Sequence, residues 1–357
     1  MVAGLSEHRI SELLIPTSMT AEGASEFAAA EAIHFAAEAE VYGTTELGYS
    51  PEETLPEYHD QENQPTRMFA VHVDGVLAAR GRYEREPGDD ASTGWLNVDV
   101  APGFRKQGIG TELADWLEDL AVADGLTKVI AYVASAASDG DQLPSPTGFG
   151  SLPADNTEVK FLVHRGYRLE QVVRASRLPL PTDVAARLVE ATATTPDYAL
   201  HFWIDHTPAR WLEDMAVLRT TMSTEEPDAG LDSPEDVWTV KRIVDTEARL
   251  DGSPRTVLVA AVEHTASGQL IGFTALSVPA EIDRPVSQED TLVLPEHRGH
   301  RLGMLLKVAN LDFLQRTRPG HPSVITFNAE ENRHMLNVNE AVGFVAIGYE
   351  GAWRRDL

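Results

Sequence analysis

The sequence predicts an α/β protein made of two versions of one unit, and three observations support this fold class. At 357 residues the chain is longer than one typical domain, and its 43% hydrophobic content suffices for packed cores. Segments with strand and helix periodicity alternate along the chain. A glycine-rich turn before an amphipathic helix occurs twice, as GFRKQGIG from Gly103 and as HRGHRLG from His297.

The first half contains a strand pair around Asp74-Gly75, which is a strong two-residue hairpin turn. A further strand ends before Pro102, and the helix after the glycine-rich turn carries leucines at helical spacing. The predicted order is strands at Arg67–Val73, Val76–Glu84 and Trp95–Val100, a helix containing Leu113, Leu117 and Leu120, a strand at Lys128–Val133, a polar loop at 135–153, a short helix that stops at Gly166, and a last strand.

The second half repeats this order. A hairpin turn is predicted at Ser267-Gly268, and a short strand ends before Pro295. The predicted elements are strands at Tyr198–Ile204, Arg255–Glu263, Gln269–Val278 and Thr291–Leu294, helices from Trp211 onward and at Arg301–Leu314, a strand at Val324–Phe327, a helix at Asn332–Val342, and a last strand that begins at Gly343.

The two halves match in register, which indicates an ancestral duplication. The offset that places Arg105 on Arg298 also places Pro102 on Pro295 and Gly110 on Gly303. A shorter offset places Gly166 on Gly343, and the difference is about the length of the polar loop in the first half. A proline-rich segment lies between the copies. The predicted domains are therefore 1–180 and 198–357, joined by a linker with one short helix at 181–197.

Composition excludes several classes of function. A net charge of −27, with acids in excess in both halves, opposes binding to nucleic acid or to anionic membrane. No apolar run is long enough to span a bilayer, and the first residues lack a signal-peptide core, so we expect a cytoplasmic protein. With no cysteine there is no disulfide and no thiolate metal site. The histidines near the second turn lack zinc-site spacing, so no metal is predicted. A homo-oligomer is left open.

Each glycine-rich turn has the physical properties of a seat for pyrophosphate. The first turn of a helix has backbone N–H groups without internal partners, and the helix dipole adds positive potential there. Glycines allow the backbone to approach an anion closely, and Arg105 and Lys106 supply further donors. Other phosphate-binding patterns fit poorly, because the chain lacks GxxxxGK[ST] and an acidic ribose clamp.

At these residues the chain resembles the GNAT superfamily of acetyl-CoA-dependent N-acetyltransferases. The family pattern is a strand, V-x-P, Arg/Gln-x-x-Gly-x-Gly/Ala, helix, strand, helix, Gly-Phe/Tyr and strand. VAPGFRKQGIG matches it in full, RGHRLG matches except for Arg301 at the first glycine, and EENRHMLNVNEAVGF is similar to the family's last helix. The resemblance covers most of the chain in two copies. It implies two tandem GNAT folds, each a mostly antiparallel mixed β-sheet flanked by helices (α+β).

The resemblance also implies a reaction in which a primary amine attacks the thioester of acetyl-CoA directly. Amides of the two turns would hold the pyrophosphate, and a backbone N–H near Val100 or Val293 would polarise the thioester carbonyl. The residues assigned to the cofactor on this basis are Val100, Arg105, Lys106, Gln107, Gly108, Ile109, Gly110 and Thr111 in the first copy, and Val293, Arg298, Gly299, His300, Arg301, Leu302, Gly303, Met304 and Asn332 in the second.

A general base is needed because only a neutral amine is nucleophilic. Asp290 is the favoured candidate, followed by Glu289 and by Asp99, which shares one face of its strand with Asn97. The alternative for each is a solvated carboxylate at a strand edge.

The acid step departs from the family pattern. Where many members have a Tyr to protonate the leaving thiolate, this sequence has Leu162 in the first copy and Asn339 in the second. An Asn amide donates a hydrogen bond but gives up no proton. Asn332 and Asn339 lie on one predicted helical stripe and are expected to line a cofactor channel, or alternatively to serve as a helix cap and as surface polarity.

The sequence leaves open which copy is catalytic. The first copy has both glycines of the turn, whereas the second has the richer set of polar residues. We expect the first copy to retain the cofactor and the second to be the catalyst or a second binding unit. The favoured function is acetyl transfer to the primary amine of a small molecule. The alternatives are a non-catalytic acyl-CoA-binding protein and an acetyltransferase acting on protein amines.

Overall fold

The computed structural model describes residues 8–357, which form two compact units interleaved along the sequence. The first unit contains the described residues up to Val172, with Ala229–Pro234 and Tyr349–Leu357, and the second contains Val173–Asp228 and Glu235–Gly348. The predicted linker at 181–197 therefore lies inside the second unit, and the linear division into domains 1–180 and 198–357 stays a prediction. The prediction that the first residues lack an export signal concerns a segment whose start, residues 1–7, lies outside the described residues.

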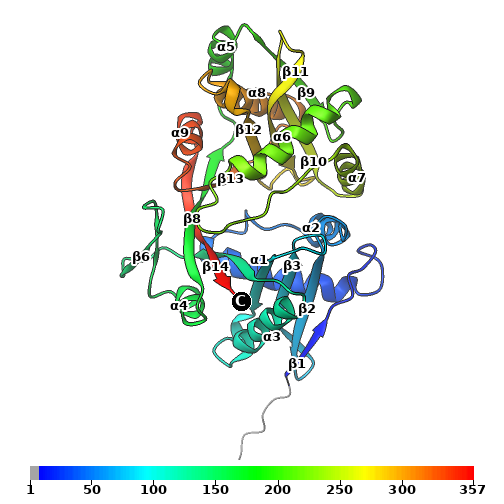
Figure 1. Cartoon of the computed structure of the whole chain (residues 1–357), viewed down its shortest axis with the longest axis vertical. Coiled ribbons are helices and arrows are strands. Elements are labelled where there is room, and N and C mark those ends of the chain that lie inside the picture. Colours follow the sequence, from blue (N-terminus) through cyan, green and yellow to red (C-terminus); the bar gives the residue numbers. More distant parts are fainter. Residues whose placement is uncertain (1–7) are drawn as a thin grey trace, which may run out of the picture. The chain divides into compact units, whose positions relative to one another are not determined.

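In the first unit, helices cover both faces of a mixed sheet with strand order β1-β2-β3-β4-β5-β14 (Figure 1). The elements assigned to this unit are β1 (His8–Glu12), α1 (Ala24–Tyr42), α2 (Pro51–Tyr58), β2 (Thr66–Val73), β3 (Val76–Arg85), β4 (Thr93–Val100), α3 (Ile109–Ala123), β5 (Lys128–Ser135), β6 (Gln142–Pro144), β7 (Ser151–Pro153), α4 (Thr157–His164), the start of β8 (Arg168–Pro179) and most of β14 (Val345–Asp356).

The period-two alternation of β2 explains why this sheet has two cores. Phe69 and Val71 pack with α3 on one face, whereas Met68 and Ala70 pack with α1 and α2 on the other. The predicted hairpin is confirmed, because Asp74 and Gly75 both have positive φ and Val73 pairs with Val76.

The second unit repeats this plan with strand order β9-β10-β11-β12-β13-β8. Its elements are α5 (Ala185–Ala193), β9 (Tyr198–Ile204), α6 (Leu212–Glu225), α7 (Val240–Leu250), β10 (Thr256–His264), β11 (Gln269–Val278), β12 (Val286–Val293), α8 (Leu302–Thr317), β13 (Ser323–Ala329) and α9 (Arg333–Val342), with the larger part of β8 and the start of β14.

The sheet of the second unit also has a core on each face. Leu258 and Ala260 of β10 pack in a cluster with α5 and α8, while Val259 and Ala261 pack with α6 and α7. The helix that follows the glycine-rich turn and the helix that precedes β10 therefore lie on opposite faces of the sheet.

The last strand of each half completes the sheet of the other half's unit. β14 runs antiparallel to β5, with Trp353 opposite Ala131, and β8 runs antiparallel to β13, with Ala175 opposite Phe327. The sequence predicts both strands but not this exchange, because strand periodicity carries no information about the partner.

Two predicted elements differ from the structure. The polar segment 135–153 is not wholly a loop, because β6 and β7 pair as a small hairpin around Gly148 and Gly150, which both have positive φ. β12 begins at Val286 rather than at Thr291. Its first residues are polar, but Gln288 is buried and donates hydrogen bonds to Thr274 and to the carbonyl of Ala275 on β11.

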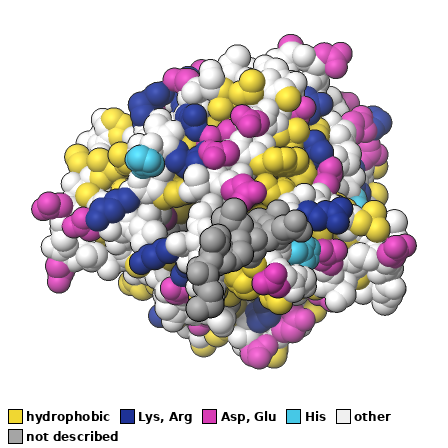
Figure 2. All heavy atoms as spheres, turned by 90° about the horizontal axis from the view of Figure 1, so that it is seen from below, with side chains coloured by type: hydrophobic (Ala, Val, Ile, Leu, Met, Phe, Trp, Pro, Cys, Tyr) yellow, Lys and Arg dark blue, Asp and Glu magenta, His cyan; other side chains and the backbone are white. Residues whose placement is uncertain are grey.

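Charged side chains of both signs are interspersed on the face in Figure 2, so this face carries no broad basic field of the kind that nucleic acid requires. Among residues 8–357, no helix has the length and apolar character needed to cross a membrane.

Candidate functional site

The two glycine-rich turns adopt the same backbone conformation although their glycines stand at different positions. Lys106 and its counterpart Gly299 both have positive φ, at 60° and 85°. Gly108 and its counterpart Arg301 do as well, at 89° and 59°. A non-glycine residue in this region costs about 1 to 2 kcal/mol. Each turn contains one such residue, so both units adopt the shared backbone conformation despite this conformational free-energy cost.

Both turns present uncapped helix N-termini. No side chain caps α3 at Gly108 or α8 at Arg301, so the first N–H groups of each helix stay available to a ligand. In the second unit, a Cβ placed on Gly299 or Gly303 would meet nothing within 4 Å. The open space and the free donors fit an anionic group of the size of a phosphate.

The arginine that occurs in both turns has a structural role. Nε of Arg105 donates to the carbonyl of Val100 at 3.0 Å, and Nε of Arg298 donates to that of Val293 at 3.2 Å. Each guanidinium also pairs with a glutamate, Arg105 with Glu40 of α1 at 2.8 Å and Arg298 with Glu225 of α6 at 2.7 Å. These arginines therefore fix the turn to the strand before it.

Each sheet opens between two parallel strands directly before the turn. β4 and β5 pair only from Thr93 to Trp95, and β12 and β13 pair only at Val286 and Ser287. The later residues of these strands diverge. The carbonyl ends of β4 and β12 therefore border a gap in the sheet.

A bulge distinguishes the second unit from the first. Thr274 of β11 pairs with Thr291, whereas Leu276 pairs with Gln288, so β12 has one residue more than β11 over this interval. Glu289 and Asp290 lie in the bulge, next to the gap. The corresponding ladder between β3 and β4 is regular from Ala79 to Arg85. A bulge frees backbone groups and redirects side chains, and it is found beside active sites.

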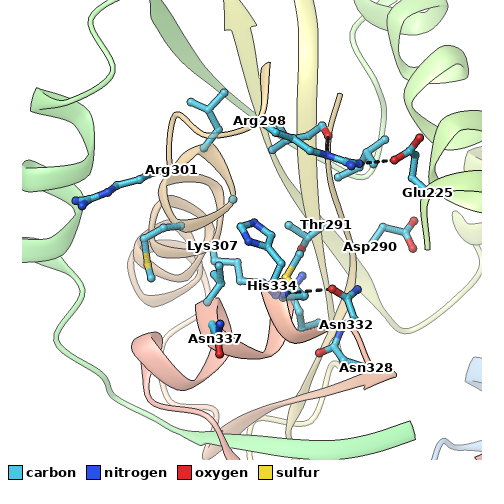
Figure 3. Close-up of a pocket in the computed structure, with 18 of the residues that line it drawn as sticks. Glu225, Asp290, Thr291, Arg298, Arg301, Lys307, Asn328, Asn332, His334 and Asn337 are labelled. Carbon is cyan, nitrogen blue, oxygen red and sulfur yellow. Dashed lines mark hydrogen bonds and ion pairs between the residues drawn. The ribbon is translucent and has the colours of Figure 1, made fainter. Parts of the chain in front are cut away.

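In the second unit, the gap between β12 and β13 opens into a cleft of about 1020 Å³ (Figure 3). β12 and β13 form its walls, the glycine-rich turn and α8 one side, α9 another, and the end of α6 its rim. The lining residues that matter here are Glu225, Glu226, Asp290, Val293, Arg298, Gly299, Arg301, Leu302, Gly303, Met304, Lys307, Asn328 and Asn332.

Comparison with known proteins relates one segment of the chain to a family and the whole chain to a fold. Residues 34–140 match the family model described as "Acetyltransferase (GNAT) family". The protein contains a GNAT-family domain. Over its whole length it is similar in structure to a tandem GNAT protein from the clavulanic acid biosynthesis pathway, with a TM-score of 0.73, 22% identity and 98% of each chain covered. Its fold is thus the tandem GNAT fold, and the predicted fold class is confirmed.

A second similar structure is a GCN5-related N-acetyltransferase from Sphaerobacter thermophilus, with a TM-score of 0.62, 15% identity, and 98% of this chain and 95% of that chain covered. A search of curated proteins found no match. The GNAT family and fold support acyl-CoA-dependent transfer of an acetyl group. The GNAT turns, their uncapped helices and the cleft beside the second one fit such a donor.

In the first GNAT unit, the strand residues that face the gap are engaged in a buried network. Arg80, 2% exposed, donates to Asn97 at 2.9 Å and to Asp99 at 3.1 Å. Nδ1 of His34 lies 2.9 Å from Asp99, and Glu31 pairs with Arg80 at 2.9 Å. Burial would raise the pKa of Asp99, but His34 and Arg80 outweigh it and lower that pKa. Asp99 is thus a paired structural carboxylate.

In the second GNAT unit, the predicted Asp290 is joined by Glu226, which no sequence motif marks. Both line the cleft, as does Glu289. Desolvation raises the pKa of the Asp290 carboxyl, against the opposing charge of Arg219 at 4.0 Å. Desolvation and then the charge of Asp290 raise the pKa of Glu226 to about 7. A carboxylate with that pKa titrates near neutral pH, which suits a proton acceptor.

The two asparagines of α9 lie in different environments. Asn332 caps the helix, since its side chain accepts from the backbone N–H of Met335 at 3.2 Å, and it lines the cleft. Asn339 is 1% exposed, donates to Asn328 at 2.6 Å and does not line the cleft. The structure therefore does not place them together along one channel.

Replacing the cap should measure its structural contribution. We expect Asn332→Ala to lower the free energy of unfolding by about 1 kcal/mol, because one N–H of the first turn of α9 loses its partner. Asn332→Asp keeps an acceptor at this position and should leave stability nearly unchanged. Urea unfolding followed by circular dichroism measures both. Equal losses in the two variants would show that the cap is not what stabilises α9.

Proposed function

We propose that the protein is an N-acyltransferase that moves the acyl group of acyl-CoA, with acetyl-CoA as the donor expected from the sequence, to the primary amine of a small molecule. The reaction takes place in the cleft of the second unit. One observation carries this proposal: a glycine-rich turn with free amides, a bulged strand and a carboxylate pair of raised pKa all border the same gap in the sheet.

The donor is held at three places in this proposal. The amides of Leu302, Gly303 and Met304 bind the diphosphate at the N-terminus of α8. The diverging edges of β12 and β13 accept the extended arm of the donor. A backbone N–H on β12, between the bulge and Val293, polarises the thioester carbonyl as an oxyanion donor.

Glu226 is the proposed general base, and Asp290 adjusts its pKa. The nitrogen of the amine forms a bond to the acyl carbon as the carbon–sulfur bond breaks, and Glu226 takes the proton that the nitrogen releases. Asp290 raises the pKa of Glu226 by its negative charge. The leaving thiolate takes its proton from solvent, because Asn339 stands where many family members carry Tyr and its amide donates to Asn328.

The acidic rim suits a cationic acceptor. The rim contains Glu225 and Glu226 at the end of α6, and Asp290, which lies beside Arg219 of α6. The chain as a whole carries a net charge of −27. An ammonium group is drawn to such a rim before it is deprotonated. In the first unit the turn is kept but Asp99 is paired, so we assign that unit to cofactor binding without transfer.

The test is a panel of primary amines incubated with acetyl-CoA and the pure protein. Mass spectrometry detects the amide, and a thiol reagent detects the CoA that is released; the protein contributes no background because it has no cysteine. We expect matched amounts of amide and thiol with at least one amine. Tight binding of CoA without thiol release from any amine or basic peptide would instead establish the non-catalytic alternative. Transfer to peptides alone would identify a protein acetyltransferase.

A further inference from the structure

Lys307 is a buried cation inside the cleft, and the proposed reaction does not use it. Lys307 is 2% exposed and lines the cleft. Figure 3 shows its side chain extending from α8 into the cleft. Among residues 8–357 no carboxylate lies within ion-pair distance of its amino group. Within this described part of the chain, its amino group has one charge-related contact, with the ring of Phe344 at 5.9 Å.

The arginines that line the cleft each have a partner within the protein. Arg298 pairs with Glu225, Arg301 is 72% exposed and lies 3.9 Å from Glu190, and Arg187 donates to the carbonyl of Ala341. The offset that relates the two turns places Lys307 on Ala114 of the first unit. The unpaired cation is therefore specific to the cleft of the second unit.

The position of Lys307 indicates which part of a ligand it meets. It lies about 7.5 Å along α8 from the residue that begins the helix, given the rise of about 1.5 Å per residue, so it is deeper than the amides that bind the diphosphate. It is on the α8 face of the sheet, whereas Arg219, beside Asp290, comes from α6 on the other face. Lys307 thus belongs to the donor side of the cleft and not to the acceptor side.

Leaving a cation buried without a partner has a free-energy cost. Burial lowers the pKa of Lys307 to about 7, so part of the population loses the charge at neutral pH. An anion that enters the cleft with the donor would remove this cost by pairing with the ammonium group. CoA itself has no charge between its diphosphate and its thiol, so the anion has to be on the acyl group.

We infer that Lys307 binds a carboxylate at the far end of the acyl group, and that the second unit prefers the CoA thioester of a short dicarboxylic acid to acetyl-CoA. This inference rests on the proposed function. The transfer itself is unchanged: the amide bond forms at the thioester carbon, the carbon–sulfur bond breaks, and the distal carboxylate remains ionised throughout.

The test compares three proteins and four probes. The proteins are the full chain, Lys307→Met and a control, Lys160→Met, which removes an exposed lysine paired with Asp155 in the first unit. The probes are CoA, acetyl-CoA, succinyl-CoA and levulinyl-CoA, whose acyl group has the shape of succinyl but no charge. Calorimetry measures affinity, and thiol release with the best amine measures kcat/KM.

The full chain should favour succinyl-CoA over levulinyl-CoA by on the order of 10- to 100-fold, the range expected for a charged hydrogen bond. Lys307→Met should remove this preference and leave the affinity for CoA and acetyl-CoA unchanged, while Lys160→Met changes nothing. Because Met replaces a buried unpaired cation with an apolar chain of similar shape, Lys307→Met should also unfold at a higher temperature than the full chain.

Two results would overturn the inference and leave the proposed function intact. The first is equal use of succinyl-CoA and levulinyl-CoA by the full chain. The second is an equal loss of affinity for all four probes in Lys307→Met, which would assign Lys307 to the diphosphate. Failure of all four probes to bind any of the proteins would instead contradict the proposed function itself.

Discussion

Gly303→Glu is expected to abolish transfer by lowering the affinity of the second unit for its donor by on the order of 100-fold or more. Gly303 lies in the first turn of α8, and a Cβ there meets nothing within 4 Å, so the substitution introduces no clash. A carboxylate in the first turn is favourable for the helix itself. It would stand beside the negatively charged diphosphate, and at about 4 Å one such charge pair costs roughly 4 kcal/mol near a protein surface.

The matched control is Gly110→Glu, the same change at the equivalent residue of the first unit. There the added Cβ approaches Val100 at 3.2 Å, which the side chain accommodates with a small shift. Calorimetry with CoA, thiol release and thermal unfolding are measured for both variants. We expect Gly110→Glu to lose one binding event and to keep turnover. The opposite pattern, turnover lost in Gly110→Glu and kept in Gly303→Glu, would place the reaction in the first unit.

Much of this architecture was predictable because it depends on local chemistry. Asp74-Gly75 predicts a hairpin since both residues tolerate positive φ, and the two turns are evident because glycine, arginine and a helix follow a strand that ends in proline. The duplication follows from register alone. The structure adds a point that register does not show: Lys106 and Arg301 replace glycines at complementary positions, and the turn keeps its shape.

The contents of the site were predictable only in part. Asp290 is a candidate from the sequence because it lies on the strand before the turn, and it lines the cleft. Glu226 lines the same cleft from the end of α6, where no motif marks it. Lys307 carries a signal in retrospect, since it interrupts an apolar stretch of α8, LLKVANL, at a buried position. Helical spacing from Asn332 predicts that Asn339 lies on the same stripe of the helix. Asn332 is the cap rather than a helical residue, however, and its φ and ψ of −75° and 60° differ from those of the helix.

The two units share one fold but differ in the side chains that lie beside the glycine-rich turn. Each unit has an arginine that joins the turn to the preceding strand and to a helix. The arginine pairs with Glu40 in the first unit and with Glu225 in the second. The first unit has a regular β4 whose carboxylate is paired with His34 and Arg80. The second has a bulged β12 whose carboxylate carries a raised pKa. The glycine-rich turn that we propose to hold a diphosphate is common to both units, whereas the carboxylates that we propose as proton acceptors are found only in the second.

Glu226→Gln is expected to lower kcat by on the order of 100- to 1000-fold with little change in donor affinity. Gln has nearly the same shape but does not accept the proton that the attacking nitrogen releases, and general bases contribute about this much. Glu289→Gln is the matched control, since Glu289 lines the same cleft and was a candidate base from the sequence. It should retain most of the activity. A larger loss in Glu289→Gln than in Glu226→Gln would exchange their roles.

The pH dependence tests the same assignment by its sign. Because desolvation beside the cleft and the charge of Asp290 raise the pKa of Glu226 to about 7, kcat/KM of the full chain should fall as the pH decreases through 7 and the base becomes protonated. Asp290→Asn removes a negative charge, which lowers the pKa of Glu226 and moves this acid limb to lower pH. All profiles use one amine, so its own ionisation is common to them. A limb that stays in place in Asp290→Asn, or that persists in Glu226→Gln, would show that Glu226 is not the base.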